Sequence, residues 1–445
     1  MLARPVRMLL ALLLLIGICL TKSVALRAAD WPQWRGPDGQ GHASARNLPI
    51  KWSETENIVW KTVLPGKGWS SPVIDGNQIW MTTAVETKLT AEERKKKLEG
   101  NKFGDQLNVS GKLSMRAQCV DRQTGKLLHD LELLAEENPA PIHALNSFAS
   151  PSPIIEDGRL YCHFGTNGTA CVDTKTNRVV WTNRETRINH ENGPGSTPIL
   201  WRNLLIFHCD GSDLQYIVAL DKLTGKIVWK TNRSGEMKSD PQLKKAYGTP
   251  MILNIGGQEL LVSQGADWLY GYEPATGHEL WKMSYGTLGF SIVPRPVFSD
   301  GLLFISTTFM QAEMLAVKIA DVQSPGEIVW RMKKQAPQMP SPLLVGKELY
   351  LVNDKGIASC VDAATGKVHW TERISGNYSS SPFFADGRIY VGSREGVTYV
   401  YEPGTSFKLL AENKLDGQIM ATPAVVDSAL FIRTDTALYR VEKKP

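Results

Sequence analysis

The sequence predicts an all-β fold: an eight-bladed β-propeller of four-stranded antiparallel blades, in which the N-terminal strand pairs with the C-terminal blade and closes the ring. Three observations predict it. A hairpin pattern recurs, seen most clearly as ALDKLTGKIVW at 219–229. A residue pair ending in Pro recurs eight times, and an outer-strand pattern that usually ends in Trp also recurs eight times. Recurrence at intervals of roughly 40–50 residues is typical of repeat architectures.

Each hairpin pattern consists of two short apolar runs joined by a polar turn, Asp/Glu-x-x-Thr-Gly-Lys. The Gly supplies a positive φ, and the acidic side chain can accept hydrogen bonds from the turn amides. A large aromatic residue follows four positions after the Gly. The lone run Asn57–Lys61 has Trp60 at the equivalent place. We expect these aromatic residues to be structural and to dock between blades: Trp60, Trp181, Trp229, Trp281, Trp330 and Trp370.

A small or polar residue followed by Pro opens each predicted inner strand. An Asp-Gly-like turn, a second apolar run and the Thr-Gly hairpin follow, which makes four strands in each unit. Eight such starts give eight blades: Ser71-Pro72, Ser152-Pro153, Thr197-Pro198, Thr249-Pro250, Arg295-Pro296, Ser341-Pro342, Ser381-Pro382 and Thr422-Pro423.

The first 25 residues are predicted to be a signal peptide. Arg4 and Arg7 give a positive start, Met8 to Leu20 is apolar, and Ser23-Val24-Ala25 suits cleavage, although a cut as late as 29 also fits. The apolar run is too short to span a membrane comfortably. We therefore expect export to the periplasm or secretion, with no transmembrane span after signal cleavage.

Residues 30–56 are predicted to form an N-terminal arm that lies on the ring and covers apolar surface, and the propeller takes 57–445. The run Asn57–Lys61 resembles an outer strand with no hairpin before it, whereas the C-terminal segment 421–441 supplies only three strands. Pairing the two ends completes one blade and removes the free edges of the ring.

The first blade contains a predicted helical insertion at about 86–114. Thr90 and Glu93 have the spacing of a capping box, and residues 91–99 form a short charged helix. Such an insertion is either a solvated decoration or an element that docks a partner.

Composition excludes some classes of function. The 445 residues are 42% hydrophobic and 21% charged, with a formal net charge of +5, and acidic neighbours offset the basic cluster at 94–97. Nucleic-acid binding is therefore not expected. The glycine-rich segment 36–41 has no preceding strand or following helix, so it does not predict a phosphate site. Five cysteines remain after cleavage. We expect those at the shared repeat position to be buried (Cys119, Cys171 and Cys360), and the pairing of Cys162 with Cys209 stays open.

The pattern A-x-D-x-x-T-G-K-x-x-W at 219–229 resembles the tryptophan-docking motif of the PQQ-repeat (pyrrolo-quinoline quinone repeat) propellers, and the resemblance covers nearly the whole mature chain. BamB-like propellers and, more distantly, quinoprotein alcohol dehydrogenases are similar in this motif. The dehydrogenases are longer and have two adjacent cysteines against their quinone, which this sequence does not have. The motif belongs to the scaffold and says little about function.

The resemblance leaves two functions open. The first is a non-catalytic, monomeric scaffold or binding protein that presents loops and blade edges to envelope proteins and needs no cofactor. The second is an oxidoreductase of the alcohol or sugar dehydrogenase type that uses PQQ and Ca²⁺. Calcium would then take oxygen ligands such as Glu191, Asn192 and Asn146.

The irregular segments before each inner strand share one face of the predicted ring, which we call the mouth. Ligand-binding loops on a rigid ring usually gather at such a place. Four of the eight histidines occur near the mouth of two successive blades, with Glu191 and Asp210 close by in sequence. Two interpretations stay open: these side chains form a site for a metal or for acid–base chemistry, or the histidines are structural and bond to backbone between blades. We expect no catalytic residue, and the candidate ligand-site residues at the mouth are Trp69, His143, Asn146, His163, His190, Glu191, Asn192, His208, Asp210, Tyr247 and Tyr378.

Overall fold

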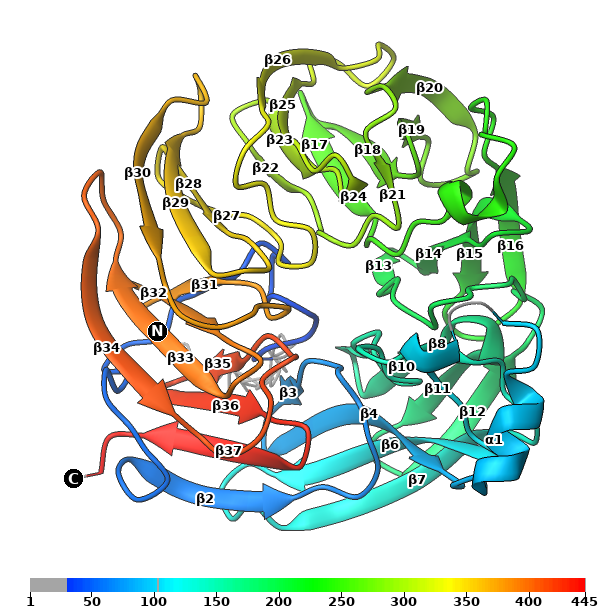
Figure 1. The fold of residues 1–445 in the computed structure, drawn as a ribbon, viewed down its shortest axis with the longest axis vertical. Coiled ribbons are helices and arrows are strands. Elements are labelled where there is room, and N and C mark those ends of the chain that lie inside the picture. The colour runs from blue at the N-terminus through cyan, green and yellow to red at the C-terminus, as the bar shows by residue number, and fades with distance from the viewer. Residues whose placement is uncertain (1–29, 102–103, 445) are drawn as a thin grey trace, which may run out of the picture.

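Eight four-stranded antiparallel sheets are arranged in a ring around a central channel (Figure 1). The structure is a computed structural model and describes residues 30–101 and 104–444. The predicted signal peptide, residues 1–25 with a cut as late as 29, lies outside the described residues. The predicted eight-bladed propeller is confirmed.

Each blade runs from an inner strand at the channel to an outer strand at the rim. We number the blades in chain order. The first four consist of β3 (Val73–Asp75), β4 (Gln78–Glu86), β6 (Leu113–Asp121) and β7 (Leu127–Glu136); β9 (Ile154–Glu156), β10 (Arg159–His163), β11 (Thr169–Asp173) and β12 (Arg178–Asn183); β13 (Ile199–Trp201), β14 (Leu204–Asp210), β15 (Gln215–Asp221) and β16 (Ile227–Asn232); and β17 (Met251–Ile255), β18 (Gln258–Gln264), β19 (Trp268–Tyr272) and β20 (Glu279–Ser284).

The last four blades follow the same order. They consist of β22 (Val297–Ser299), β23 (Leu302–Ser306), β25 (Met314–Lys318) and β26 (Glu327–Met332); β27 (Leu343–Val345), β28 (Glu348–Val352), β29 (Ile357–Asp362) and β30 (Val368–Arg373); β31 (Phe383–Ala385), β32 (Arg388–Gly392), β33 (Val397–Glu402) and β34 (Lys408–Lys414); and β35 (Ala424–Val426), β36 (Ala429–Arg433), β37 (Ala437–Glu442) and β2 (Ile58–Val63).

Blade 8 closes the ring with strands from both ends of the chain. β2 pairs antiparallel with β37, with Trp60 opposite Arg440 and Thr62 opposite Leu438. The two strands lie side by side in Figure 1. The predicted closure is confirmed, and its physical basis is that each end alone would leave a strand edge unpaired.

The turns before the outer strands dock six of the eight blades on the blade before them. In blade 3, Asp221 Oδ1 accepts hydrogen bonds from the backbone N–H and the hydroxyl of Thr224, both at 2.8 Å. The indole Nε1–H of Trp181, in blade 2, donates to the carbonyl of Lys222 in that turn at 3.1 Å. The same contact to the next blade is made by Trp60, Trp229, Trp281, Trp330 and Trp370.

The arm crosses the face that carries the Asp-Gly turns, opposite the mouth. Trp31 and Trp52 are buried in it, and β1 (His42–Ala43) pairs parallel with β31. At the ring axis, the Trp34 indole donates to the Thr422 hydroxyl at 3.2 Å. The arm therefore closes one end of the channel.

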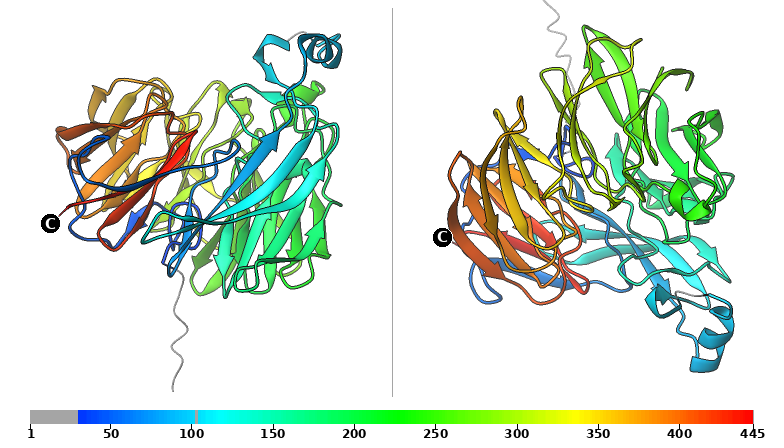
Figure 2. Two further views of the ribbon diagram at one scale, coloured as in Figure 1. Left: turned by 90° about the horizontal axis from the view of Figure 1, so that it is seen from below. Right: turned by 45° about the horizontal axis from the view of Figure 1, so that its top comes forward.

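The insertion in blade 1 projects from the ring beside the mouth (Figure 2). It contains α1 (Ala91–Lys97), the 3-10 turn η1 (Gly104–Gln106) and β5 (Leu107–Asn108), and the capping box between Thr90 and Glu93 is present. β5 pairs with β8 (Ile142–His143), which begins the mouth loop of blade 2.

The remaining short elements lie in other connections. They are η2 (Gly165–Asn167), η3 (Pro241–Lys244) and the two-stranded sheet of β21 (Gly289–Phe290) and β24 (Phe309–Met310). Within residues 30–101 and 104–444, five cysteines are buried and free, namely Cys119, Cys162, Cys171, Cys209 and Cys360. Within the same residues, no helix has the length and apolarity needed to cross a membrane.

Candidate binding site at the mouth of the central channel

The residues before the recurring prolines form a ring around the channel, and hydrogen bonds link most of its neighbours. At five of the eight positions the backbone N–H donates to the hydroxyl of the equivalent residue in the next blade, as from Ser71 to Ser152 at 2.8 Å and from Ser152 to Thr197 at 3.1 Å. The same link joins Arg295 to Ser341, Ser341 to Ser381 and Ser381 to Thr422. The sequence marker is therefore a structural device that holds inner strands together at the axis.

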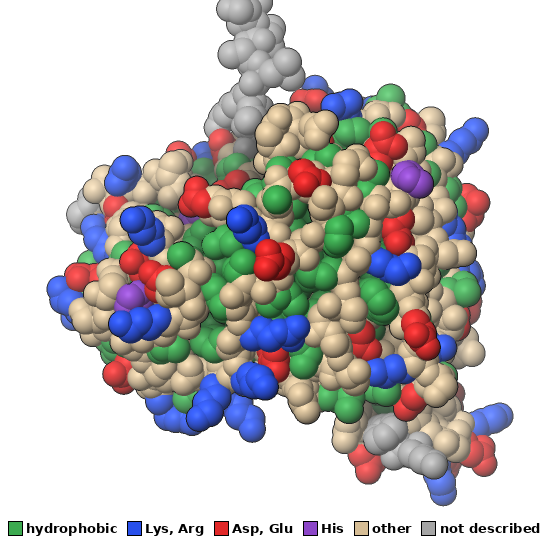
Figure 3. Space-filling view, turned by 90° about the horizontal axis from the view of Figure 1, so that it is seen from above, with side chains coloured by type: hydrophobic (Ala, Val, Ile, Leu, Met, Phe, Trp, Pro, Cys, Tyr) green, Lys and Arg blue, Asp and Glu red, His purple; other side chains and the backbone are tan. Residues whose placement is uncertain are grey.

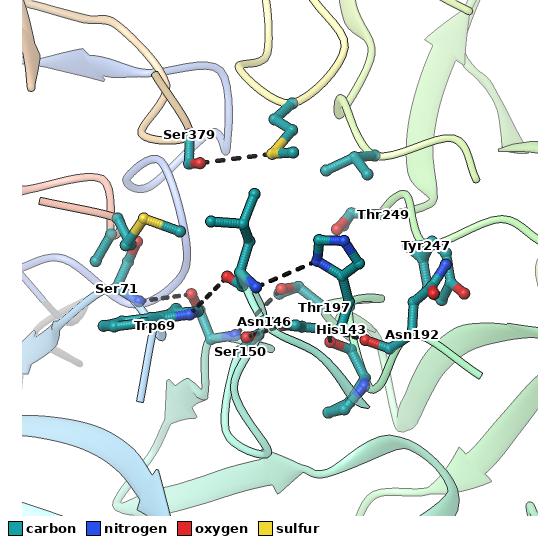
Figure 4. Close-up of a pocket in the computed structure, with 18 of the residues that line it drawn as sticks. Trp69, Ser71, His143, Asn146, Ser150, Asn192, Thr197, Tyr247, Thr249 and Ser379 are labelled. Atoms are coloured by element: carbon teal, nitrogen blue, oxygen red, sulfur yellow. Dashed lines mark hydrogen bonds between the residues drawn. The ribbon is translucent and has the colours of Figure 1, made fainter. Parts of the chain in front are cut away.

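Above this ring, the channel widens into a cavity of about 240 Å³ that opens at the mouth (Figure 4). Trp34 lies at its closed end, and its walls come from the segments that precede the inner strands of all eight blades and from β24. None of the described residues that line it carries a formal charge at neutral pH: Trp34, Trp69, Ser71, His143, Leu145, Asn146, Ser150, Ser152, Asn192, Pro194, Gly195, Thr197, Tyr247, Thr249, Ser291, Val293, Phe309, Met339, Ser379, Met420, Ala421 and Thr422.

Aromatic side chains form much of the wall, and backbone contacts fix them. The Trp69 indole donates to the Leu145 carbonyl at 3.0 Å, and the Tyr247 hydroxyl donates to the His190 carbonyl at 2.6 Å. His143 Nδ1 accepts from the Leu145 N–H at 3.2 Å, and burial followed by the Arg394 charge lowers its pKa, which keeps the imidazole neutral. The cavity thus offers rigid apolar surfaces with hydroxyls at their base.

The mouth loop of blade 2 is itself tied down. The Asn146 amide donates to the carbonyls of Asn192 at 2.7 Å and Pro194 at 3.1 Å, and Asn146 Oδ1 accepts from the Ser147 N–H at 2.8 Å. Asn146 therefore joins the loops of blades 2 and 3 and has little capacity left for a ligand.

Large apolar side chains are exposed around the opening. Leu145 is 42% exposed, Phe309 38% and Met310 66%. Leu145 and Phe309 also line the cavity, so the apolar rim is continuous with the apolar wall. Exposed apolar side chains at the opening of a cavity are typical of an interaction site.

The structure brings five of the predicted site residues to the cavity and places six elsewhere. Trp69, His143, Asn146, Asn192 and Tyr247 line it. Each of the other six forms a hydrogen bond or an ion pair with another group of the protein: His163, His190, Glu191, His208, Asp210 and Tyr378.

The predicted histidines have separate partners. His163 Nδ1 lies 2.8 Å from the Thr169 hydroxyl, and His190 Nε2 accepts from the Thr166 N–H at 3.0 Å. His208 Nδ1 lies 3.0 Å from the Ser263 hydroxyl, inside a buried network centred on an ion pair between Arg233 and Asp210. Such contacts are typical of structural histidines.

The calcium-ligand set that the quinoprotein alternative requires does not fit the arrangement found. Glu191 forms an ion pair with Lys245 at 2.7 Å, and the Asn146 side chain is bonded to backbone. Calcium takes six to eight oxygen ligands and usually several carboxylates. Among the residues that the structure describes, no group of three or more His, Cys, Asp or Glu side chains could hold a metal ion.

Most wall residues were not among the site residues predicted from the sequence, and Trp34, Leu145 and Phe309 are three of them. Trp34 reaches the cavity from the arm, and Phe309 reaches it from the short strand β24. Leu145 lies in a mouth loop in which the predicted site residues are the polar His143 and Asn146. The exposed apolar residues Phe309-Met310 between two strands were the available signal.

Comparisons with known proteins agree with this architecture. A family model described as outer membrane protein assembly factor BamB matches residues 75–231, 202–321 and 316–409. The chain belongs to this family. The BamB of Legionella pneumophila (strain Paris) is 24% identical over 204 residues, which is 44% of this chain and 50% of that protein. The BamB of Yersinia pestis is 22% identical over 215 residues, 44% of this chain and 51% of that protein. The chain thus spans about half the length of the curated BamB relatives it matches.

Solved structures share the fold with this BamB-family chain. The crystal structure of BamB from Moraxella catarrhalis has a TM-score of 0.56 and 12% identity, covering 86% of this chain and 99% of that one. The computationally designed Ika8 protein also has a TM-score of 0.56 and 12% identity, covering 85% and 98%. At these identities the similarity shows the fold alone.

Proposed function

We propose that this BamB-family chain is an exported, non-catalytic scaffold that acts as a monomer in the periplasm or outside the cell and binds envelope proteins at its mouth. The observation that carries the proposal is the uncharged cavity with its exposed apolar rim. Burying apolar surface contributes roughly 25 cal/mol per Å², so rim residues left in water favour association with an apolar partner surface.

The blade edges provide a second surface for the same function. Outer strands expose an aliphatic residue immediately before the docking position, as at Val59, Val180, Val228 and Val329. Figure 3 shows apolar side chains gathered in the middle of the side of the ring that carries β20 and β26, with charged side chains around them. An outer edge has free backbone groups, so it can pair with a strand of a partner.

Site-specific photo-cross-linking in the native cell envelope tests the proposal. A photoreactive residue at Leu145 or Met310 is expected to capture envelope proteins. Leu223 is the matched control because it is 65% exposed but belongs to a Thr-Gly turn on the opposite face. The substitutions Leu145→Asp and Met310→Asp should abolish capture at the other mouth position, whereas Leu223→Asp should not. Equal capture at all three positions would contradict a mouth-specific function.

A further inference from the structure

Two arginines are buried near the ring axis on the closed side of the channel. Arg35 comes from the arm and is 0% exposed; Arg295 is 4% exposed. Arg295 occupies the ring position of blade 5, where the other seven blades have Ser or Thr. The cation therefore replaces a hydroxyl at one point of an otherwise uncharged ring.

The glycine-rich segment 36–41 packs against both guanidinium groups. A Cβ atom on Gly39 would lie 2.4 Å from Arg295 Nη1, and one on Gly41 would lie 2.9 Å from Arg35 Nη2. The two glycines are separated by a single residue, so the segment holds the two cations near each other. The backbone N–H groups of Gly39 and Gly41 donate to the carbonyls of Gly36 and Arg35, so these two amides are already hydrogen-bonded within the loop.

Several guanidinium N–H groups have no acceptor among the described residues. Arg35 Nη2 donates to the carbonyls of Gln40 at 2.8 Å and Pro342 at 2.7 Å, but its Nε and Nη1 are unpartnered. Arg295 Nη1 lies 3.4 Å from the Trp34 carbonyl, and its Nε is unpartnered. Buried donors without acceptors are strongly unfavourable.

The charges of these two groups are also not compensated by an ion pair. Within the described chain neither guanidinium forms an ion pair. The acidic group whose charge acts on both is Asp38, but its carboxylate is hydrogen-bonded to His42 and to the Gln40 N–H. Burial and then the Arg295 charge lower the pKa of Arg35 to about 9, and burial lowers the pKa of Arg295 to about 10. Both are therefore cations at neutral pH, and two such cations need a counter-charge.

We propose that Arg35 and Arg295 form a binding site for a small inorganic anion such as chloride, which locks the arm onto the ring. One anion can accept the unpartnered N–H groups and offset the repulsion between the two guanidiniums, whereas a water molecule supplies no charge. The site is separate from the mouth cavity, because Trp34 lies at the closed end of that cavity and its carbonyl faces Arg295.

Thermal unfolding of the mature protein at constant ionic strength tests the proposal, with chloride replaced stepwise by gluconate, an anion much larger than chloride. The unfolding temperature is expected to rise with chloride and then saturate, and bromide should act similarly. Arg295→Thr, which restores the residue type of the other blades, should abolish this dependence, and so should Arg35→Met.

Arg433→Met is the matched control. Arg433 is also buried, at 3% exposure, and lies in blade 8 without an ion pair in the described chain. Its Nε is unpartnered as well, but its Nη1 has three oxygen acceptors, the Ser70 carbonyl and hydroxyl and the Thr82 carbonyl, and burial alone, with no neighbouring cation, lowers its pKa. This variant should lose stability but keep the chloride dependence.

Anomalous diffraction from crystals grown in bromide locates the ion directly. A bromide peak between Arg35 and Arg295, absent in Arg295→Thr, is the expected result. A chloride dependence that survives in both Arg35→Met and Arg295→Thr, or halide found only elsewhere, would overturn the proposal.

Discussion

At the scale of the residue, the hairpin glycine has two roles in the structure. Gly225 has a φ of 73°, in the region that favours glycine, and it also lies directly under the Trp181 ring of the preceding blade. A Cβ atom there would be 2.4 Å from the indole. The sequence pattern indicated only the first role.

Gly225→Ala is therefore expected to destabilise the protein more than Gly387→Ala. Gly387 has nearly the same φ, 72°, but a Cβ there meets nothing within 4 Å. We expect a loss of about 1 kcal/mol for Gly387→Ala from backbone strain, and about 1–3 kcal/mol more for Gly225→Ala because the Trp181 contact must shift. Chemical denaturation of the two variants measures the difference. Equal losses would show that the indole moves aside without cost.

At the scale of the element, the blade 1 insertion braces the mouth. β5 pairs Leu107 with His143, and the Ala144 N–H donates to the Gln106 carbonyl at 2.8 Å. α1 has no buried residue, so its place depends on contacts such as that of Arg94 with the Leu107 carbonyl. These contacts favour a positioning role for an element that the sequence left as either decoration or docking site.

The insertion can be removed with little change to the blade. Thr87 and Lys112 are already bonded through their backbones across the β4–β6 hairpin, so an Asn-Gly turn can replace residues 88–111. We expect stability to change by less than about 1 kcal/mol and hydrogen exchange to accelerate at least tenfold at Ala144, because its acceptor is lost. Exchange in β28 serves as the control. Unchanged protection at Ala144 would show that the mouth loop needs no brace.

At the scale of the whole molecule, neutral histidines inside blades 2 and 3 connect the stability of the ring to pH. Burial lowers the pKa of His163 to about 3 and the pKa values of His190 and His208 to about 4. Each imidazole binds a proton more readily in the unfolded chain, where its pKa is about 6.5. The free energy of unfolding is therefore at its full value above pH 6.5. It decreases as the pH falls from there towards the folded-state pKa values, because protons bind to the unfolded chain first.

The free energy of unfolding is expected to be lower at pH 5 than at pH 7, by up to about 2 kcal/mol for each of these three histidines. Urea denaturation at the two pH values measures it. His163→Gln should make the difference smaller, because Gln keeps a hydrogen-bonding group but does not titrate. The same stability at both pH values would mean that these imidazoles are hydrated in the folded protein.

The sequence by itself determined the propeller, the number of blades and the way the ring closes. These features depend on short patterns repeated along the chain, such as Asp221 to Gly225 and the Ser/Thr-Pro pairs, and each repeat can be interpreted locally. The unmatched outer strand at Trp60 likewise requires a partner, and only the C-terminal blade lacked one. The sequence also located the mouth, since alternating turns must fall on opposite faces.

The tertiary structure decided what the mouth contains. Trp34 closes the cavity through a contact with Thr422, and Arg35 reaches the Pro342 carbonyl, across 388 and 307 positions of the chain respectively. No local pattern specifies such pairs, because they depend on how the arm crosses the assembled ring. The histidines show the same limit: the repeat placed them close together, but the side chains of Thr169 and Ser263 and the backbone N–H of Thr166 determine where their nitrogens point.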